Sequence, residues 1–304
     1  MPNSGSRAVI PGGQAALYIA AFGFAFVNLF VKLAGASFHP LFVSGARFAM
    51  GIVLALAALG LRRVRIDRRL WPDVILRGFF GALSMTATYA AINLTGPGRG
   101  ALLSNSYPVF VTIFGALFFG EKPGKRVIVS LALCVLGSAF VMRDGSGASL
   151  AGDLLALFAS LTAGVAVNFV RRASKAGADP FLLYLSPSVF GLPILFFAPF
   201  PTAVPGLLPI LFLLGVGVLA FAAQALMALG YRTVSAAKGS VTFFLETGLT
   251  VILGLLFAGE HLTLGFALGL ALIFAGLWWN RGRPSGPAPG AAAVVSPAEG
   301  LPPI

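Results

Sequence analysis

The sequence contains few charged residues and few of the residue types that usually carry catalysis. Charged residues make up 10% of the 304 positions and hydrophobic residues 58%, whereas a soluble domain has about 25% charged residues. The single cysteine, Cys134, has no partner for an intrachain disulfide. The two histidines, His39 and His261, fall in expected loops, and no cluster of His, Asp and Glu has the spacing of a metal site. The sequence therefore excludes a soluble domain and supports no enzyme, metal or cofactor.

Nucleotide and nucleic-acid binding are also poorly supported. The glycine-rich segment Gly96-Pro-Gly-Arg-Gly100 follows an apolar run, whereas a dinucleotide-binding loop follows a strand. Lys and Arg outnumber Asp and Glu by 21 to 9, which gives a net charge of +12. These basic residues lie in short loops between apolar runs, which is the pattern that orients membrane proteins. The expected partners are membrane lipid and a small-molecule solute, with no nucleic acid.

The sequence is rich in apolar runs of about 20 residues, long enough for each to cross a bilayer as a helix. The predicted spans, with ends uncertain by about 2–4 residues, are 14–35, 40–60, 74–94, 97–119, 126–142, 150–171, 181–200, 207–230, 237–258 and 262–280. The first residues, 1–13, lack a cleavable-signal pattern. We expect them and the Pro/Gly/Ala-rich segment 283–304 to be disordered tails.

The second half of the chain repeats the first at an offset of about 139 residues. Gly115-Ala-Leu-Phe-Phe-Gly-Glu121 matches Gly254-Leu-Leu-Phe-Ala-Gly-Glu260, and Arg99 matches Lys238. Because each copy holds five spans, an odd number, the copies must enter the membrane in opposite orientations. The predicted fold is an all-α integral membrane protein with ten transmembrane helices as two inverted five-helix repeats, 14–143 and 144–282. This is an architecture of secondary transporters.

The distribution of Lys and Arg predicts how the chain sits in the membrane. With the N-terminus inside, most basic residues fall in cytoplasmic segments, Arg77 among them, so both termini are expected in the cytoplasm. Lys32, Arg47 and Arg99 are left in or near the outer halves of helices. The sequence leaves a monomer and a homodimer both open.

Polar residues inside the spans cost free energy in lipid and are therefore candidates for solute contacts. Glu246, near the middle of the ninth span, is also a candidate for proton coupling, and the repeat offset matches it to Tyr107. Pro108 in the fourth span frees a backbone carbonyl beside several polar side chains. For each candidate the alternative role is structural, as an ion pair, an interhelical hydrogen bond or a packing contact. The candidates are Asn28, Arg47, Tyr89, Asn93, Arg99, Ser104, Asn105, Tyr107, Asn168, Gln224, Phe243 and Glu246.

These features resemble the EamA-type permeases of the drug/metabolite transporter superfamily. The resemblance rests on the duplicated five-helix unit, on Phe118-Phe-Gly-Glu121 repeated as Phe257-Ala-Gly-Glu260, and on Arg47-Phe48. The sequence departs from the family at Thr247, where a proline is often found. The resemblance implies a basket of helices around a central cavity, with the fifth and tenth spans peripheral, in a bacterial inner membrane.

The function implied is gradient-driven secondary transport, since no nucleotide-binding motif is present. The resemblance suggests export of small organic metabolites such as amino acids or related compounds by alternating access. An uptake or exchange carrier for an anionic metabolite is the alternative, suggested by Lys32, Arg47 and Arg99. A scaffold or receptor that transports nothing is a third reading, from a different class.

Overall fold

The computed structural model describes residues 12–60, 68–119, 125–143, 149–176, 178–202, 204–233 and 236–279. This part of the chain is helical and contains no strand. The helices of the first half are α1 (Gly12–Ala34), α2 (Pro40–Gly60), η1 (Arg68–Leu70), α3 (Trp71–Thr95), α4 (Pro97–Ser104), α5 (Tyr107–Phe119) and α6 (Lys125–Arg143). Those of the second half are α7 (Leu150–Lys175), α8 (Pro180–Gly191), η2 (Leu192–Phe197), α9 (Leu207–Thr233), α10 (Ala236–Phe257) and α11 (Leu264–Trp279). The predicted tail 283–304 and nearly all of 1–13 lie outside the described residues.

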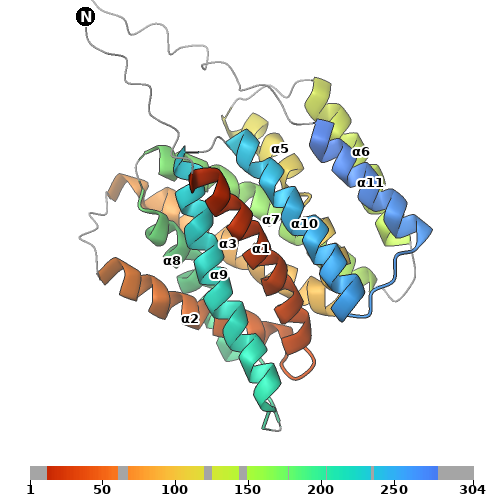
Figure 1. Ribbon diagram of the computed structural model, residues 1–304. Coiled ribbons are helices and arrows are strands. Elements are labelled where there is room, and N and C mark those ends of the chain that lie inside the picture. The colour runs from red at the N-terminus through yellow and green to blue at the C-terminus, as the bar shows by residue number, and fades with distance from the viewer. Residues whose placement is uncertain are drawn as a thin grey trace, which may run out of the picture.

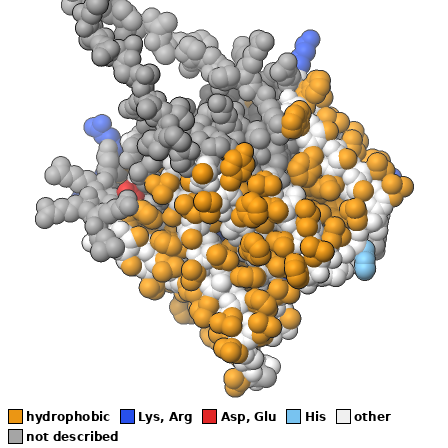
Figure 2. Space-filling model, viewed as in Figure 1, with side chains coloured by type: hydrophobic (Ala, Val, Ile, Leu, Met, Phe, Trp, Pro, Cys, Tyr) orange, Lys and Arg blue, Asp and Glu red, His pale blue; other side chains and the backbone are white. Residues whose placement is uncertain are grey.

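The helices are apolar enough to cross a membrane. Six stretches of 20–28 residues qualify by length and hydropathy, and four shorter apolar helices make up the other predicted spans. Large hydrophobic side chains are exposed along them, for example Leu117 at 70% and Leu264 at 77%. They cover the face shown in Figure 2, as lipid rather than water requires. The all-helical fold with ten spans is confirmed.

Two predicted spans are interrupted where prolines occur. The fourth span is divided into α4 and α5 at Asn105 and Ser106, directly before Pro108. The seventh is divided into α8 and the 3-10 helix η2, which begins beside Pro193. A proline has no N–H to donate to the preceding turn, so the α-helical ladder stops there. The polar side chains of Asn105 and Ser106 lie at this break, and that of Asn105 reaches Thr247 on α10.

The two halves interlock. Helix α1 packs on α9 and α10, α3 packs on α7 and α8, and α4 lies between α7 and α10. Helices α6 and α11 pair with each other at one side of the molecule (Figure 1), as the resemblance implied for the fifth and tenth spans. Their pairing is close because Gly137 and Gly269 face each other: a Cβ on Gly137 would lie 2.8 Å from the Gly269 carbonyl oxygen. The remaining helices of both halves surround a polar centre.

Candidate solute site between the two repeats

A group of polar side chains joins α1, α10 and the break between α4 and α5. The amide of Asn28 donates to Glu246 Oε1 and to Thr250 Oγ1, each at 3.3 Å. The amide of Asn105 donates to Thr247 Oγ1 at 2.9 Å and lies within hydrogen-bonding reach of the Glu246 carboxylate. Glu246 keeps partial exposure while Asn28 is buried. Both repeats thus contribute to one carboxylate site, centred on Glu246.

A second group surrounds Arg47 on α2. The Arg47 side chain is buried, and its guanidinium carbon lies 5.5 Å from the Tyr89 ring centroid and 5.6 Å from that of Phe48. Nη1 lies 2.8 Å from the Met85 sulfur, a weak acceptor, and Nε has no hydrogen-bond partner. Among the described residues no acidic side chain bonds to Arg47. An arginine buried in this way retains donors for an anionic group.

Tyr89 on α3 lies between these two groups. Its hydroxyl is within electrostatic range of Arg47, of Glu246 and of Tyr184 on α8. Tyr107, which begins α5, is within range of Glu246, so the repeat mates Tyr107 and Glu246 do lie near each other. The structure therefore brings together six predicted site residues: Asn28, Arg47, Tyr89, Asn105, Tyr107 and Glu246.

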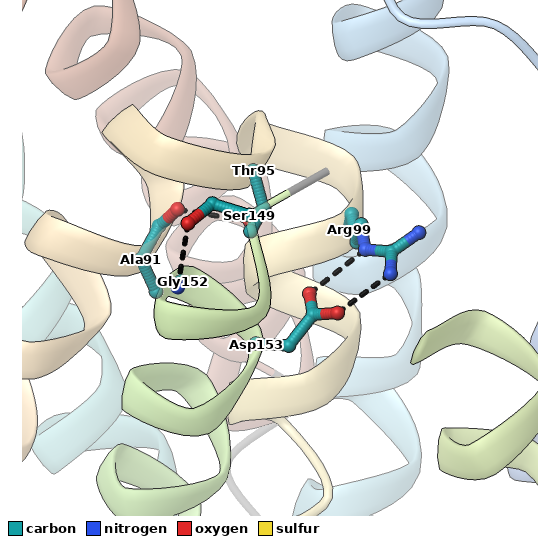
Figure 3. A network of polar contacts seen from close by, with 6 residues as sticks. All are labelled: Ala91, Thr95, Arg99, Ser149, Gly152 and Asp153. Carbon is teal, nitrogen blue, oxygen red and sulfur yellow. Dashed lines mark hydrogen bonds and ion pairs between the residues drawn. The ribbon is translucent and has the colours of Figure 1, made fainter. Parts of the chain in front are cut away.

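Arg99 is placed differently, because its charge is compensated within the protein. Its Nε and Nη2 donate to the two carboxylate oxygens of Asp153 at 2.8 and 2.6 Å (Figure 3). The Ser149 hydroxyl accepts from the Gly152 N–H at 3.4 Å and so caps α7, which holds Asp153 in the first turn. This ion pair joins α4 of one repeat to α7 of the other. The geometry favours a structural role for Arg99.

The start of α4 is held by an acid from the other repeat. Glu260, just beyond α10, accepts from the Gly98 N–H at 3.0 Å and from the Arg99 N–H at 3.3 Å. Burial raises the pKa of Glu260 above its ordinary value of 4.5, and these backbone donors and the charges of Lys32 and Arg99 oppose the rise. Lys32 itself donates to the Asn93 carbonyl at 2.9 Å. The predicted outer cations Lys32 and Arg99 are therefore both engaged at this helix end.

Three of the other predicted candidates, Asn93, Asn168 and Phe243, contact groups within the protein. The Asn93 amide donates to the Tyr89 carbonyl at 3.0 Å, and the Asn168 amide donates to the carbonyls of Gly164 and Val111 at 3.0 Å. Phe243 is buried, with its ring 6.1 Å from that of Phe24. Gln224 and Ser104 are buried on α9 and α4, and the Ser104 hydroxyl has no partner among the described residues. The bond from Asn168 to Val111 joins α7 to α5, a contact of the kind that holds membrane helices together.

Sequence reasoning missed Arg77, Tyr184 and Ser188. The charge pattern assigned Arg77 to a cytoplasmic segment, but it lies about six residues inside α3 and is 7% exposed. The predicted span 74–94 already contained Arg77, and Trp71-Pro72 marks an earlier helix start, since proline is favoured in the first turn. Tyr184 and Ser188 lie four residues apart on one face of α8. This spacing of four residues in the sequence could have indicated that the two hydroxyls share a helix face.

Fold and site together define a multi-pass membrane protein built from two repeats. A model of the EamA-like transporter family matches residues 12–143 and 150–281. The chain belongs to this family.

Two curated relatives share part of the sequence. The pseudopaline exporter CntI of Pseudomonas aeruginosa is 29% identical over 157 residues, covering 50% of this chain and 55% of the relative. Solute carrier family 35 member G1 of Mus musculus is 25% identical over 210 residues, covering 63% and 56%. The chain spans about half the length of these relatives. A solved crystal structure with 18% identity matches 88% of this chain and 96% of its own, with a TM-score of 0.62, and shows the same fold.

Proposed function

We propose that the protein is a gradient-driven exporter of amino acids or related compounds. It would work by alternating access between two units, 14–143 and 144–282, in a bacterial inner membrane with both termini in the cytoplasm. The observation that carries this proposal is the placement of Tyr89 within electrostatic range of both Arg47 and Glu246. A cation 5.5 Å from the centre of this ring, and an anion within electrostatic range of its hydroxyl, fit a solute that carries both a carboxylate and an ammonium group.

Each group has a defined part in this proposal. Arg47 has an unpartnered Nε and binds the solute carboxylate, for which the flat guanidinium fork is suited. Glu246, partly exposed beside Asn28, binds the ammonium group. The hydroxyls of Tyr89 and Tyr107 donate to polar atoms between these ends. The interruption at Asn105 resembles the broken helices that form central sites in other carriers.

The proposed direction is outward. It is supported by the name of one relative, an exporter, and the proposed energy source is an ion gradient. Glu246 is the coupling candidate, because a carboxylic acid that takes up and releases a proton changes its hold on an ammonium group. The alternative, uptake or exchange of an anionic metabolite, is favoured by one observation: Arg47 has no acidic partner in the described part of the chain.

The test uses the full chain in proteoliposomes with radiolabelled alanine, lysine and glutamate. Counterflow of at least one of these amino acids is expected, with accumulation driven by an imposed pH gradient. Glu246→Gln keeps the side-chain shape and should exchange the solute without concentrating it, because the titrating group is lost. Accumulation unchanged by Glu246→Gln would remove this residue as the coupling site.

A matched pair of variants tests the carboxylate contact. Arg47→Met should lose counterflow, whereas Arg143→Met, at an exposed position ending α6, should retain it.

The direction of transport is measured in everted and right-side-out membrane vesicles. Accumulation only in everted vesicles supports export, and accumulation only in right-side-out vesicles supports the uptake alternative. Absence of flux for all three amino acids would contradict the proposed substrate class.

A further inference from the structure

The described acidic residues all have partners other than Arg47 and Arg77. Asp73 bonds to Arg172, Asp153 to Arg99, Asp179 to the Phe181 N–H, Glu246 to Asn28, and Glu260 to the N–H groups of Gly98 and Arg99. No ion pair within the described residues reaches either of these two arginines. Their positive charges are left without a compensating group in that part of the chain.

Arg47 and Arg77 are both buried, at 4% and 7% exposure, on the neighbouring helices α2 and α3. In each the Nε atom has no hydrogen-bond partner. The two guanidinium groups are near enough for the charge of Arg47 to act on Arg77. Burying one uncompensated charge is costly, and placing a second like charge beside it adds repulsion. An anion bound beside the two guanidinium groups offsets both of these costs.

Helix α8 adds polar groups to the surroundings of the two arginines. A Cβ on Gly51 would lie 2.7 Å from the Ser188 Oγ and 3.1 Å from the Tyr184 hydroxyl oxygen. On α3, a Cβ on Gly81 would meet the Arg77 guanidinium. Gly51 lets α2 approach the hydroxyls of α8, and Gly81 lets the Arg77 guanidinium lie against α3 beside Pro187 of α8. Tyr184 is also within electrostatic range of Arg47, so the cluster combines two cations with hydroxyls from the second repeat.

We propose that Arg47 and Arg77 form one paired site for a doubly negative end of the transported solute. Two carboxylates, or one phosphate monoester, supply the two charges that the pair requires. A single carboxylate compensates only one guanidinium and leaves the other buried and unpaired. This inference rests on the proposed function, since it assigns the chemical class of the solute end that binds opposite Glu246.

The test measures apparent affinities of the purified full chain in nanodiscs from ligand-dependent thermal shifts. The probes are alanine, glutamate and O-phosphoserine. Glutamate or O-phosphoserine should bind at least about tenfold more tightly than alanine, equivalent to about 1.4 kcal/mol. A preference for glutamate identifies the dicarboxylate, and a preference for O-phosphoserine identifies the phosphate monoester.

Variants of Arg77 test whether this residue causes the tighter binding of glutamate or O-phosphoserine. Arg77→Met should reduce the affinity for the preferred probe to that for alanine, while the exposed control Arg143→Met leaves the preference intact. Arg77→Lys keeps the charge but loses the guanidinium fork, so it should retain part of the preference over alanine. If Arg77→Met fails to fold, the result for Arg77→Lys decides the test. A preference that survives in both Arg77 variants would overturn the inference. Equal binding of all three probes by the wild-type protein overturns this inference alone, whereas absence of any binding also counts against the proposed function.

Discussion

The carboxylate of Asp153 receives two hydrogen bonds from the guanidinium of Arg99, at 2.8 and 2.6 Å, from one repeat to the other. The side chains are 7% and 1% exposed. The Glu260 carboxylate accepts hydrogen bonds from the Gly98 and Arg99 N–H groups at the start of the same helix. Gly96, with a φ of 97°, allows the sharp turn into α4. The start of α4 is therefore fixed by acids from the second repeat, so this helix end belongs to the contact between the repeats.

Breaking the Arg99–Asp153 pair on one side should destabilise the protein strongly. Arg99→Met and Asp153→Asn are each expected to cost about 3–5 kcal/mol, because each leaves a buried charge unpaired. The double variant should lose less than the sum of the two. Thermal unfolding of detergent-solubilised protein, followed by size-exclusion chromatography, measures this. Arg172→Met is the control: the Arg172 side chain is 49% exposed, so its pair with Asp73 should contribute less. Additive losses would show that the two residues do not interact.

Glu260 predicts a pH dependence of stability. Its pKa is raised above 4.5 in the folded protein, chiefly by burial, so between 4.5 and the raised value the folded chain holds a proton that the unfolded chain has released. Its contribution to stability is largest at low pH and falls as the pH rises through that window. In Glu260→Gln this slope should disappear. The measurement is the unfolding temperature of both proteins from pH 4 upward, and parallel profiles would contradict the assignment.

Repeat mates should face opposite sides of the membrane. Ser37, between α1 and α2, and Ala176, between α7 and α8, are both exposed and correspond at the repeat offset. In a Cys134→Ala background, a membrane-impermeant maleimide added outside intact cells should label Ser37→Cys and leave Ala176→Cys unlabelled. Everted vesicles should show the reverse. Labelling of both positions from the same side would refute the inverted arrangement.

The sequence predicted the spans well because length and hydropathy alone decide them. Its errors occur where proline or a buried charge changes the local outcome. The fourth span was expected as one helix, but it divides before Pro108. Arg77 was counted among the cytoplasmic charges, and charge counting does not register that its side chain is buried between helices.

Within the site, a sequence indicates which residues are polar but not which are already partnered. The sequence predicted both Arg47 and Arg99 in the outer halves of helices and gave them the same interpretation. Arg99 meets Asp153, 54 residues further along the chain, whereas Arg47 lies against the Met85 sulfur and two aromatic rings, with no acidic partner among the described residues. Glu246 meets Asn28 across 218 residues. Pairings over such separations depend on how the helices pack, which no local pattern specifies.

Gly51 gives a prediction that links packing to solute binding. A methyl group there would lie 2.7 Å from the Ser188 Oγ, a separation that forces the side chain or α8 to move. Gly51→Ala should therefore weaken glutamate binding about tenfold, equivalent to about 1.4 kcal/mol, by shifting the Ser188 and Tyr184 hydroxyls away from Arg47. Gly248→Ala is the matched control, because a Cβ at Gly248 on α10 meets nothing within 4 Å. Both variants are compared with the wild type by ligand-dependent thermal shift. Unchanged affinity in Gly51→Ala, with the protein folded, would place the solute away from the contact between α2 and α8.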